Sequence, residues 1–255
     1  MGLSIRERLF RAWYWYVSKI DKKAEVLFMN FGYSDNKTPI NLDANDEDNR
    51  YSIQLYHHLA IEADLKNKDL VEIGSGRGGG LNYICNTFAP KTALGVEKNG
   101  LAVSFCNNFY KNKGLSFIEG DAQELQLPSN CCDVVINVES SHRYPNIESF
   151  YSEVYRILRP NGYFLFTDFR FDYNFDTMRQ KLLSCGLKLV TEKNINKEVV
   201  NALTLDDSRK RNLVKKLTPR VLHKIALNFA GTIGSETYNN FETGKYVYST
   251  FVLKK

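Results

Sequence analysis

The chain has 255 residues, of which 43% are hydrophobic and 25% are charged, and its formal net charge is +5. This length and composition are typical of an ordinary globular protein and predict one domain with elaborations. The basic excess is too small for the dense positive face of a nucleic-acid-binding protein, so no nucleic-acid partner is expected.

The N-terminal region, residues 5–28, has the pattern of an amphipathic helix rich in basic and aromatic residues. Its apolar residues fall on one side at helical spacing: Leu9, Trp13, Val17 and Ile20. Two interpretations stay open, namely a helix packed on the domain and an interfacial helix that contacts lipid or covers an apolar substrate. A polar loop is expected over 34–50, followed by a helix from about 49 to 63.

Strands and helices then alternate along the chain. The expected strands are 69–73, 92–97, 115–119, 132–138, 163–168 and 187–193, and the expected helices are 78–88, 100–112, 146–158 and 174–185. Residues 196–230 have a helical and basic pattern, and 246–253 alternate as a late strand. Such alternation predicts an α/β fold with a mainly parallel sheet and helices on both faces.

The segment Val71–Gly80 joins an apolar strand pattern to a helix through a cluster of glycines. Glycines let the backbone turn tightly and let a ligand approach it, and a helix N-terminus offers free N–H groups. The spacing of Gly74, Gly76 and Gly79 alone is compatible with a dinucleotide. Glu72 favours S-adenosylmethionine (SAM) over NAD, because a carboxylate attracts the ammonium group of SAM and repels a pyrophosphate.

Acidic residues also follow the next two strands, at the carboxyl ends where parallel sheets bind ligands. Glu97 stands 23 positions after Gly74, and an acid at that place hydrogen-bonds a ribose diol. Asp121 and Ala122 follow the third strand, where a carboxylate is able to accept a hydrogen bond from an adenine amino group. The Asp-Ala pair fits a methyl donor better than a nicotinamide cofactor.

A polar run from Asn137 to His142 closes the fourth strand, where a substrate would meet the sulfonium of SAM. A neutral imidazole at His142 is able to take a proton from a substrate hydroxyl. Glu139 is a second candidate base. The alternatives are a structural or substrate-binding role for His142 and a cofactor contact for Glu139.

These motifs resemble those of the class I SAM-dependent methyltransferases, and the resemblance runs from about Asn30 to the C-terminus. The resemblance is strongest for the phthiotriolone/phenolphthiotriolone dimycocerosates O-methyltransferase group, whose members act on long lipid polyketides. The matching stretches are Met29–Tyr33, Glu47–Tyr51, Val71–Gly80, Asn137–His142, Leu158–Gly162 and Thr167–Arg170. Two departures are mild: Glu97 stands where aspartate is commoner, and Ser75 replaces a common cysteine.

The resemblance implies roles for individual residues. The glycine loop would hold the methionine part of SAM, the acid after the second strand its ribose, and the Asp-Ala pair its adenine. Tyr33 would close over the cofactor, Arg50 would lie near the methionine carboxylate, and Asn137 would contact the cofactor. The complete expected cofactor set is Tyr33, Arg50, Glu72, Gly74, Ser75, Gly76, Glu97, Lys98, Asp121, Ala122 and Asn137.

The resemblance also implies a Rossmann-like, seven-stranded sheet with the last strand antiparallel. Residues 1–60 are expected to form an N-terminal helical cap, and 61–255 a SAM-binding domain with a helical lid at 196–235. The expected reaction is methyl transfer from SAM to a hydroxyl of a hydrophobic small molecule, polyketide or lipid, leaving S-adenosylhomocysteine. N- or C-methylation, a non-catalytic SAM- or lipid-binding module and an NAD-dependent oxidoreductase are the alternatives.

Five cysteines at scattered positions suggest neither a disulfide framework nor a zinc site, and no His, Cys and carboxylate cluster predicts a metal. This cysteine usage favours a reducing compartment, with the cytoplasm as the expected location. The N-terminus lacks the pattern of a signal peptide, and no apolar run reaches the ~20 residues that span a bilayer. Peripheral membrane contact through the N-terminal helix stays an alternative, and the oligomeric state stays open.

Overall fold

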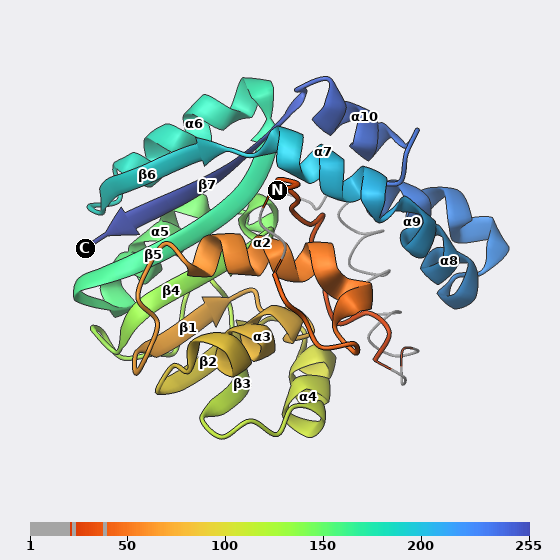
Figure 1. Ribbon diagram of the computed structural model, residues 1–255. Helices are drawn as coiled ribbons and strands as arrows, with labels where there is room; N and C mark the ends of the chain where they lie inside the picture. Colours follow the sequence, from red (N-terminus) through yellow and green to blue (C-terminus); the bar gives the residue numbers. More distant parts are fainter. Residues whose placement is uncertain (1–20, 22–23, 38–39) are drawn as a thin grey trace.

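The computed structural model describes Asp21, residues 24–37 and residues 40–255. These residues contain a seven-stranded sheet in the order β3-β2-β1-β4-β5-β7-β6 (Figure 1). The strands are β1 (Asp69–Ile73), β2 (Thr92–Glu97), β3 (Leu115–Glu119), β4 (Cys132–Val138), β5 (Leu158–Phe171), β6 (Lys188–Asn194) and β7 (Tyr246–Lys254). Strands β1 to β5 pair in parallel, whereas β7 is antiparallel to both β5 and β6. The predicted seven-stranded sheet with an antiparallel last strand is confirmed.

Helices pack on both faces of this sheet (Figure 1). The α-helices are α2 (Arg50–Ala60), α3 (Gly79–Phe88), α4 (Gly100–Phe109), α5 (Ile147–Ile157), α6 (Asp172–Leu183), α7 (Asn196–Leu205), α8 (Asp207–Leu217), α9 (His223–Phe229) and α10 (Glu236–Glu242). Short 3-10 helices are η1 (Glu47–Asn49), η2 (Ser141–Arg143) and η3 (Arg220–Leu222). None of the described helices combines the length and the apolarity needed to cross a bilayer.

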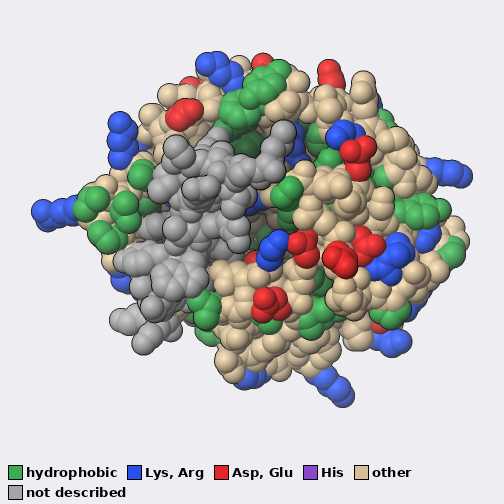
Figure 2. Space-filling model, turned by 180° about the vertical axis from the view of Figure 1, so that it is seen from behind, with side chains coloured by type: hydrophobic (Ala, Val, Ile, Leu, Met, Phe, Trp, Pro, Cys, Tyr) green, Lys and Arg blue, Asp and Glu red, His purple; other side chains and the backbone are tan. Residues whose placement is uncertain are grey.

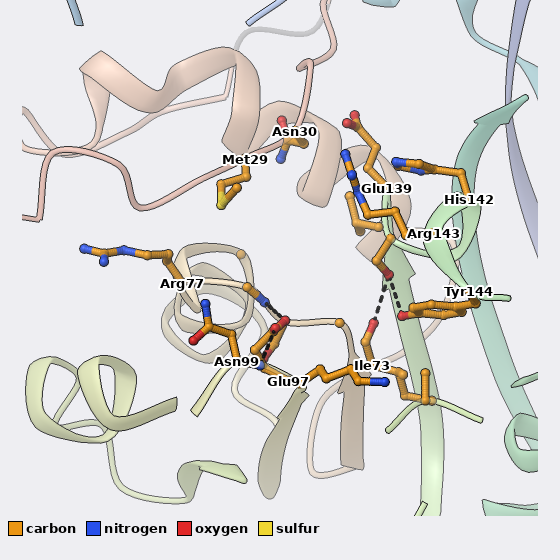
Figure 3. A pocket seen from close by; sticks show the side chains of 18 of the residues that line it. Met29, Asn30, Ile73, Arg77, Glu97, Asn99, Glu139, His142, Arg143 and Tyr144 are labelled. Atoms are coloured by element: carbon orange, nitrogen blue, oxygen red, sulfur yellow. Dashed lines mark hydrogen bonds between the residues drawn. The ribbon is translucent and has the colours of Figure 1, made fainter. Parts of the chain in front are cut away.

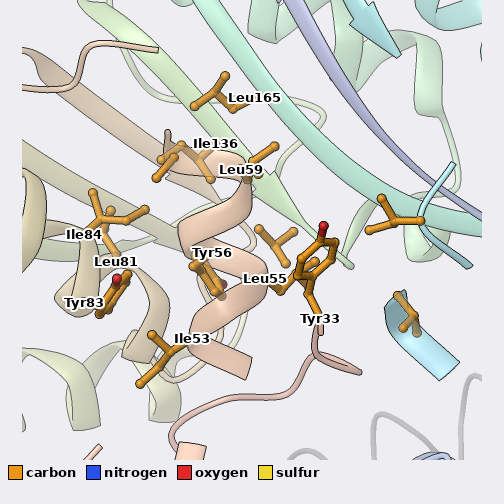
Figure 4. Close-up of a cluster of buried hydrophobic side chains, with 14 of the residues drawn as sticks. Tyr33, Ile53, Leu55, Tyr56, Leu59, Leu81, Tyr83, Ile84, Ile136 and Leu165 are labelled. Atoms are coloured by element: carbon orange, nitrogen blue, oxygen red, sulfur yellow. The ribbon is translucent and has the colours of Figure 1, made fainter. Parts of the chain in front are cut away.

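Side-chain alternation along the strands decides which helices each strand residue meets. Leu70 of β1 belongs to a buried cluster with residues of α2, α3, α7 and α10. Its neighbour Val71 belongs to a second cluster, with residues of α5 and α6. Because side chains two apart on a strand share a face, Glu72 points to the same side as Leu70 and lies beneath α2. Figure 4 shows this first cluster, with Tyr56 of α2 beside Leu81 of α3.

Element boundaries differ from the sequence expectations mainly where tertiary contacts extend or interrupt a pattern. Strand β5 runs over Leu158–Phe171 rather than 163–168, because it pairs with β7 along Tyr163 to Phe171. The expected helical stretch 196–230 is divided into α7, α8, η3 and α9. One of these breaks falls at Pro219, which has no backbone N–H for a helical hydrogen bond.

Two further differences concern helices. The sequence patterns did not predict α10, which begins after Ser235, whose hydroxyl accepts a hydrogen bond from the N–H of Tyr238 at 3.1 Å.

The helix expected over 5–28 lies mostly outside the described residues, and its described end, 24–28, is not helical. Ala24 has a φ of 57°, which a right-handed helix does not allow. The Asp21 carboxylate accepts from two backbone N–H groups of this segment at 3.0 and 2.8 Å, so the prediction is wrong for 24–28.

Candidate active site

A cavity of about 800 Å³ opens at the carboxyl ends of the parallel strands (Figure 3). Residues after β1, β2 and β3 line one half of it, including the glycine loop, Glu97 and Asp121. Aromatic side chains line the other half: Phe31, Phe169, Phe171, Phe229 and Tyr246. Because β4 lies between β1 and β5 in the sheet, the residues after β4 stand between the polar half and the aromatic half.

The glycine loop, residues 74–80, brings backbone close to the cavity and to neighbouring elements. Gly74 has a φ of 75°, and a Cβ there would lie 2.4 Å from the Ser140 hydroxyl oxygen. A Cβ at Gly80 would lie 1.9 Å from the Tyr56 ring, so this glycine lets α3 pack closely against α2. Any side chain at these two positions would move the loop out of place. The loop therefore presents backbone, rather than side chains, to a ligand.

The carboxylate of Glu97 joins the end of β2 to the glycine loop. It accepts hydrogen bonds from the backbone N–H groups of Gly76 at 3.1 Å and Asn99 at 2.9 Å (Figure 3). Burial raises the pKa of Glu97, although the backbone hydrogen bonds oppose that shift. Each carboxylate oxygen has further lone pairs, and the residue lines the cavity. Glu97 is therefore placed to accept hydrogen bonds from two adjacent hydroxyl groups of a ligand.

Asp121 lies at the end of the neighbouring strand. Its carboxylate pairs with the Lys98 ammonium at 2.6 Å and accepts from the backbone N–H of Gln123 at 3.0 Å. Burial alone would raise its pKa, but the hydrogen bonds from Gln123 and Lys98 lower it to about 2. Asp121 is therefore ionised at neutral pH. Ala122, which follows it, is buried and also lines the cavity.

His142, in η2 after β4, stands between the two halves of the cavity with its imidazole 16% exposed. Burial lowers its pKa to about 4, although the Asp168 carboxylate opposes that shift, so the ring is neutral at physiological pH. Its Nδ1 lies 2.8 Å from the Asp168 Oδ1. A carboxylate only accepts, so the single proton of the neutral ring belongs on Nδ1. The Nε2, which has no hydrogen-bond partner among the described residues, carries a free lone pair.

Asp168, near the end of β5, is itself firmly held. Its Oδ2 accepts from the Ser141 hydroxyl at 2.6 Å and the His142 backbone N–H at 3.0 Å, and it pairs with Arg170 at 3.2 Å. Its Oδ1 also accepts from the Phe169 N–H at 2.8 Å. Burial alone would raise its pKa, but His142 and Arg170 hold it well below its usual range. A fixed carboxylate therefore sets both the orientation and the tautomer of His142.

Glu139, the first residue after β4, has a different environment. Its φ is 46°, a left-handed conformation that non-glycine residues seldom adopt. Its Oε1 accepts from the Phe31 backbone N–H at 2.8 Å and the Tyr248 hydroxyl at 2.7 Å. Burial raises its pKa to about 8, because these hydrogen bonds only partly oppose the loss of solvent. Its carboxyl group therefore joins the segment before α2 to β7 across the cavity wall.

The comparisons with known proteins agree with this geometry. A family model described as a methyltransferase domain matches residues 71–166. A fatty-acid O-methyltransferase of Mycolicibacterium smegmatis is 38% identical over 87% of this chain and 81% of its own. A phthiotriol/phenolphthiotriol dimycocerosates methyltransferase of Mycobacterium tuberculosis is 32% identical over 99% of this chain and 94% of its own. The chain belongs to the class I SAM-dependent methyltransferases.

Solved structures show the same fold at low sequence identity. The cyclopropane synthase MmaA2 of Mycobacterium tuberculosis superposes with a TM-score of 0.72 at 12% identity, covering 95% of this chain and 98% of its own. A geranyl diphosphate C-methyltransferase of Streptomyces coelicolor A3(2) gives 0.66 at 12% identity, covering 100% and 99%. At these identities the likeness concerns the fold of the methyltransferase and not its substrate.

The cavity brings together nine of the thirteen expected site residues. Those that line it are Gly74, Ser75, Gly76, Glu97, Lys98, Asp121, Ala122, Glu139 and His142. The other four, Tyr33, Arg50, Glu72 and Asn137, are not among its lining residues. Their side chains have partners within the protein.

Glu72 and Asn137 are fully buried beneath the cavity floor. The Glu72 carboxyl accepts from the Tyr56 hydroxyl at 2.7 Å, and burial raises its pKa to about 8. Its Oε2 has no hydrogen-bond partner among the described residues. The expected contact of Glu72 with the cofactor stays a prediction. Asn137 donates to the Ile73 carbonyl at 2.7 Å and the Ser140 hydroxyl at 2.7 Å, so it holds β1 and β4 in register at their ends.

Tyr33 and Arg50 lie farther out. The Tyr33 ring stacks on His58 with centroids 4.2 Å apart and is buried. Arg50 forms an ion pair with Glu47 and donates to the Ile40 carbonyl at 2.8 Å. Both residues brace the loop before α2. Neither residue lines the cavity, and their expected contact with the cofactor stays a prediction.

Several residues of the site were not expected from the sequence. Asp168 and Arg170 fall in the matching stretch Thr167–Arg170, and their position near the end of a parallel strand was the available signal. Arg170 lines the cavity, whereas Asp168 contacts the lining residue His142. Arg143 and Tyr144 directly follow the recognised His142, and both line the cavity. Among the residues that the structure describes, no group of three or more His, Cys, Asp or Glu side chains is arranged to hold a metal ion.

Proposed function

We propose that this methyltransferase binds SAM in the polar half of the cavity and methylates a hydroxyl group of a hydrophobic molecule, such as a lipid or polyketide, in the aromatic half. One observation carries the proposal. A neutral imidazole, held by a buried carboxylate, belongs to a residue that lines the cavity between its two halves, and its Nε2 is buried without a hydrogen-bond partner among the described residues. A base at that place serves a hydroxyl acceptor, which must lose a proton as it is methylated.

The polar half has the chemistry that SAM requires. Glu97 offers carboxylate oxygens to the ribose diol, and the ionised Asp121 offers one to the adenine amino group. The glycine loop would surround the methionine part, and the Ser75 hydroxyl is buried there without a partner among the described residues. When bound, SAM supplies an electrophilic methyl group on a sulfonium. After the reaction the same residues hold S-adenosylhomocysteine.

The residues of the chain itself then perform three tasks. His142 accepts the acceptor's proton at Nε2, and Asp168, a positioning residue, stabilises the imidazolium that results. The aromatic side chains hold the acceptor by burial of apolar surface, which contributes about 25 cal/mol for each Å² removed from water. They also exclude water from the neighbourhood of His142, which favours direct transfer to the hydroxyl.

The relatives support a hydrophobic acceptor. Their names specify a fatty acid and a phthiotriol lipid, and the aromatic half of this cavity suits either. A carboxyl acceptor is a second candidate, because Arg143 and Arg170 also line the cavity. A carboxylate arrives deprotonated, so it needs a cation and no base. The two candidates therefore differ in their dependence on His142.

We further propose that the expected cap and lid enclose the acceptor. Phe229 of α9 and Thr237 of α10 line the cavity, as do residues 27–31 before α2. The Phe31 ring packs against Phe169 and Phe241 with centroids 5.5 and 5.0 Å apart. In this proposal residues 1–60 act as the cap and helices within 196–235 as the lid.

The deciding experiment measures transfer of a labelled methyl group from SAM to a matched panel of long-chain alcohols and fatty acids, with products identified by mass spectrometry. We expect alcohol methyl ethers from the wild type and their loss in His142→Ala, while SAM binding by calorimetry stays unchanged. Methyl esters that form equally well in His142→Ala would favour the carboxyl acceptor. Products methylated on nitrogen or carbon would refute O-methylation.

A further inference from the structure

The surface formed by α8, η3 and α9 combines exposed apolar side chains with exposed basic ones. Val221 is 84% exposed and Ile225 is 37% exposed. Four residues apart in consecutive helical turns, they lie on one side of this segment. Lys215, Lys216, Arg220 and Lys224 are also exposed. Figure 2 shows apolar side chains at the left edge of the molecule with Lys and Arg on either side.

The charge of this segment exceeds that of the whole chain. Residues 207–225 contain seven Lys and Arg residues and one acidic residue, so they carry a net charge of +6, against +5 for the complete chain. The rest of the protein is therefore almost neutral. The basic excess is a local feature rather than a property of the general surface.

Part of this charge is already paired within the fold. Arg209 pairs with Asp206, Arg211 with Asp207, and Lys216 with Glu25. Lys210 is buried, and its ammonium donates to the Phe31 carbonyl at 3.3 Å. Within the described part of the chain, Lys215, Arg220 and Lys224 form no ion pair. These three cations remain for an external anion, on either side of Val221 and Ile225.

The same segment also reaches the aromatic half of the cavity. Helix α9 has only seven residues, with Ile225 on the surface, Ala226 buried and Phe229 lining the cavity. A hydrophobic surface that receives Val221 and Ile225 would therefore lie within one or two helical turns of the acceptor region. A water-soluble partner would gain nothing from this proximity.

We propose that the face made by Lys215, Arg220, Val221, Lys224 and Ile225 docks on an anionic lipid surface. Val221 and Ile225 enter the boundary between headgroups and acyl chains, while the three cations contact anionic headgroups. Each Lys or Arg near such a surface strengthens binding about five-fold at moderate ionic strength. Docking itself is independent of the reaction, but the delivery of a lipid acceptor to the cavity rests on the proposed function.

The test uses the full chain and co-sedimentation with vesicles of pure phosphatidylcholine or of phosphatidylcholine containing one third phosphatidylglycerol. We expect binding to the anionic vesicles that weakens as NaCl rises from 0.05 to 0.5 M. The variant Arg220→Glu/Lys224→Glu should bind at least 25-fold more weakly. The variant Val221→Ser/Ile225→Ser tests the apolar component and should also reduce binding.

A matched control has the same charge change on another surface. Lys66 and Lys113 are exposed and precede β1 and β3, at the amino ends of the strands and away from the cavity. Lys66→Glu/Lys113→Glu should retain vesicle binding within a factor of two or three. Equal weakening by both double variants would overturn the proposal, because it would show only a dependence on net charge. Equal binding of the wild type to both kinds of vesicle, or binding to double-stranded DNA and not to vesicles, would overturn it as well.

Methyl transfer to a short, water-soluble alcohol separates the two proposals. The docking variants should retain that activity, because none of their residues lines the cavity. Methyl transfer without vesicle binding would remove the docking face and leave the proposed reaction intact. Vesicle binding without transfer to any hydroxyl would do the reverse. Should a double variant fail to fold, the single variants Arg220→Glu and Lys224→Glu decide the proposal, since each should bind the anionic vesicles at least five-fold more weakly.

Discussion

The substitution Asp168→Asn tests the most specific feature of the site, the tautomer of His142. Oδ2 of Asp168 faces three donors, namely the Ser141 hydroxyl, the His142 N–H and Arg170, whereas Oδ1 faces the imidazole Nδ1 and one N–H. The single oxygen of an asparagine is best satisfied at the Oδ2 position. Its NH2 group then faces Nδ1, which must become an acceptor.

The ring proton would consequently move to Nε2, where it removes the lone pair that is proposed to accept the substrate's proton. General-base catalysis contributes about 10²- to 10⁴-fold, so we expect kcat to fall by about that factor. The KM for the acceptor and the Kd for SAM should change little, because Asp168 touches neither. His142→Ala should reduce kcat similarly, and the double variant should be hardly worse than either single one, since the two residues act as one unit.

A loss of stability has to be separated from this effect. Removing the buried Asp168 charge, which pairs with the partly buried Arg170, costs about 3 kcal/mol. This loss lowers Tm by roughly 6–12 °C in a chain of this size. Rates should therefore be measured well below the transition. Nitrogen NMR of the labelled imidazole reports the tautomer directly. If Asp168→Asn keeps the proton on Nδ1, or keeps wild-type kcat with alcohol acceptors, the assigned role of Asp168 is wrong.

The pH dependence follows from the same pair. The pKa of His142 is lowered to about 4 by burial, so the ring is neutral and competent as a base from about pH 5 upward. We expect the acidic limb of kcat to fall only near pH 4 to 5, provided that the protein remains folded. An acidic limb near pH 6.5 would mean that the imidazole is solvated during turnover.

Three further variants test other parts of the structure. Glu97→Ala should weaken SAM binding about 10- to 100-fold in calorimetry, because hydrogen bonds to a charged group contribute about 1.5–3 kcal/mol. The control variant Glu119→Ala, at the end of β3 and outside the cavity lining, should leave SAM binding unchanged. Glu139→Gln should flatten the pH dependence of stability. With its pKa raised to about 8, Glu139 in the folded protein keeps a proton that the unfolded chain releases above about pH 4.5, so the free energy of unfolding falls as pH rises through that window. Urea titrations at pH 5.5 and 8 measure this slope, and an equal slope in the variant would contradict the assigned environment. Asp21→Ala should lower stability by about 3 kcal/mol, because it leaves the buried Arg77 without its ion-pair partner; a loss below 1 kcal/mol would count against that pairing.

The sequence predicted the central sheet closely. Strands β1 to β4 have the bounds expected from their apolar runs and the turns between them, because buried parallel strands need continuous hydrophobic residues. The polar strand ends also converge as expected, since the carboxyl ends of parallel strands meet at one edge. The cavity positions of His142 and Glu97 were therefore predictable from their motifs and their places at the strand ends.

The orientation of the Glu72 side chain was not predicted from the sequence. Its place before the glycines predicted a charge facing the ligand, but its parity on β1 turns it beneath α2, against the Tyr56 hydroxyl. The sequence shows that Glu72 and Leu70 share one face of β1, but it does not show which helix covers that face. Asp168 was missed for a related reason, because its contact with His142 joins two strand ends 26 residues apart in the chain. Pairings of this kind arise only when the sheet is assembled.

Arg77 has a consequence for how the protein responds to its cofactor. This residue belongs to the glycine loop, but its side chain reaches the segment before α2, where it pairs with Asp21 at 3.1 Å and donates to the Val26 carbonyl at 3.1 Å. A ligand that orders the glycine loop therefore also stabilises the contact between Arg77 and that segment. By thermodynamic linkage, the contact in turn strengthens binding of the ligand. Loss of the Asp21 carboxylate should accordingly weaken SAM binding, although Asp21 is not among the residues that line the cavity.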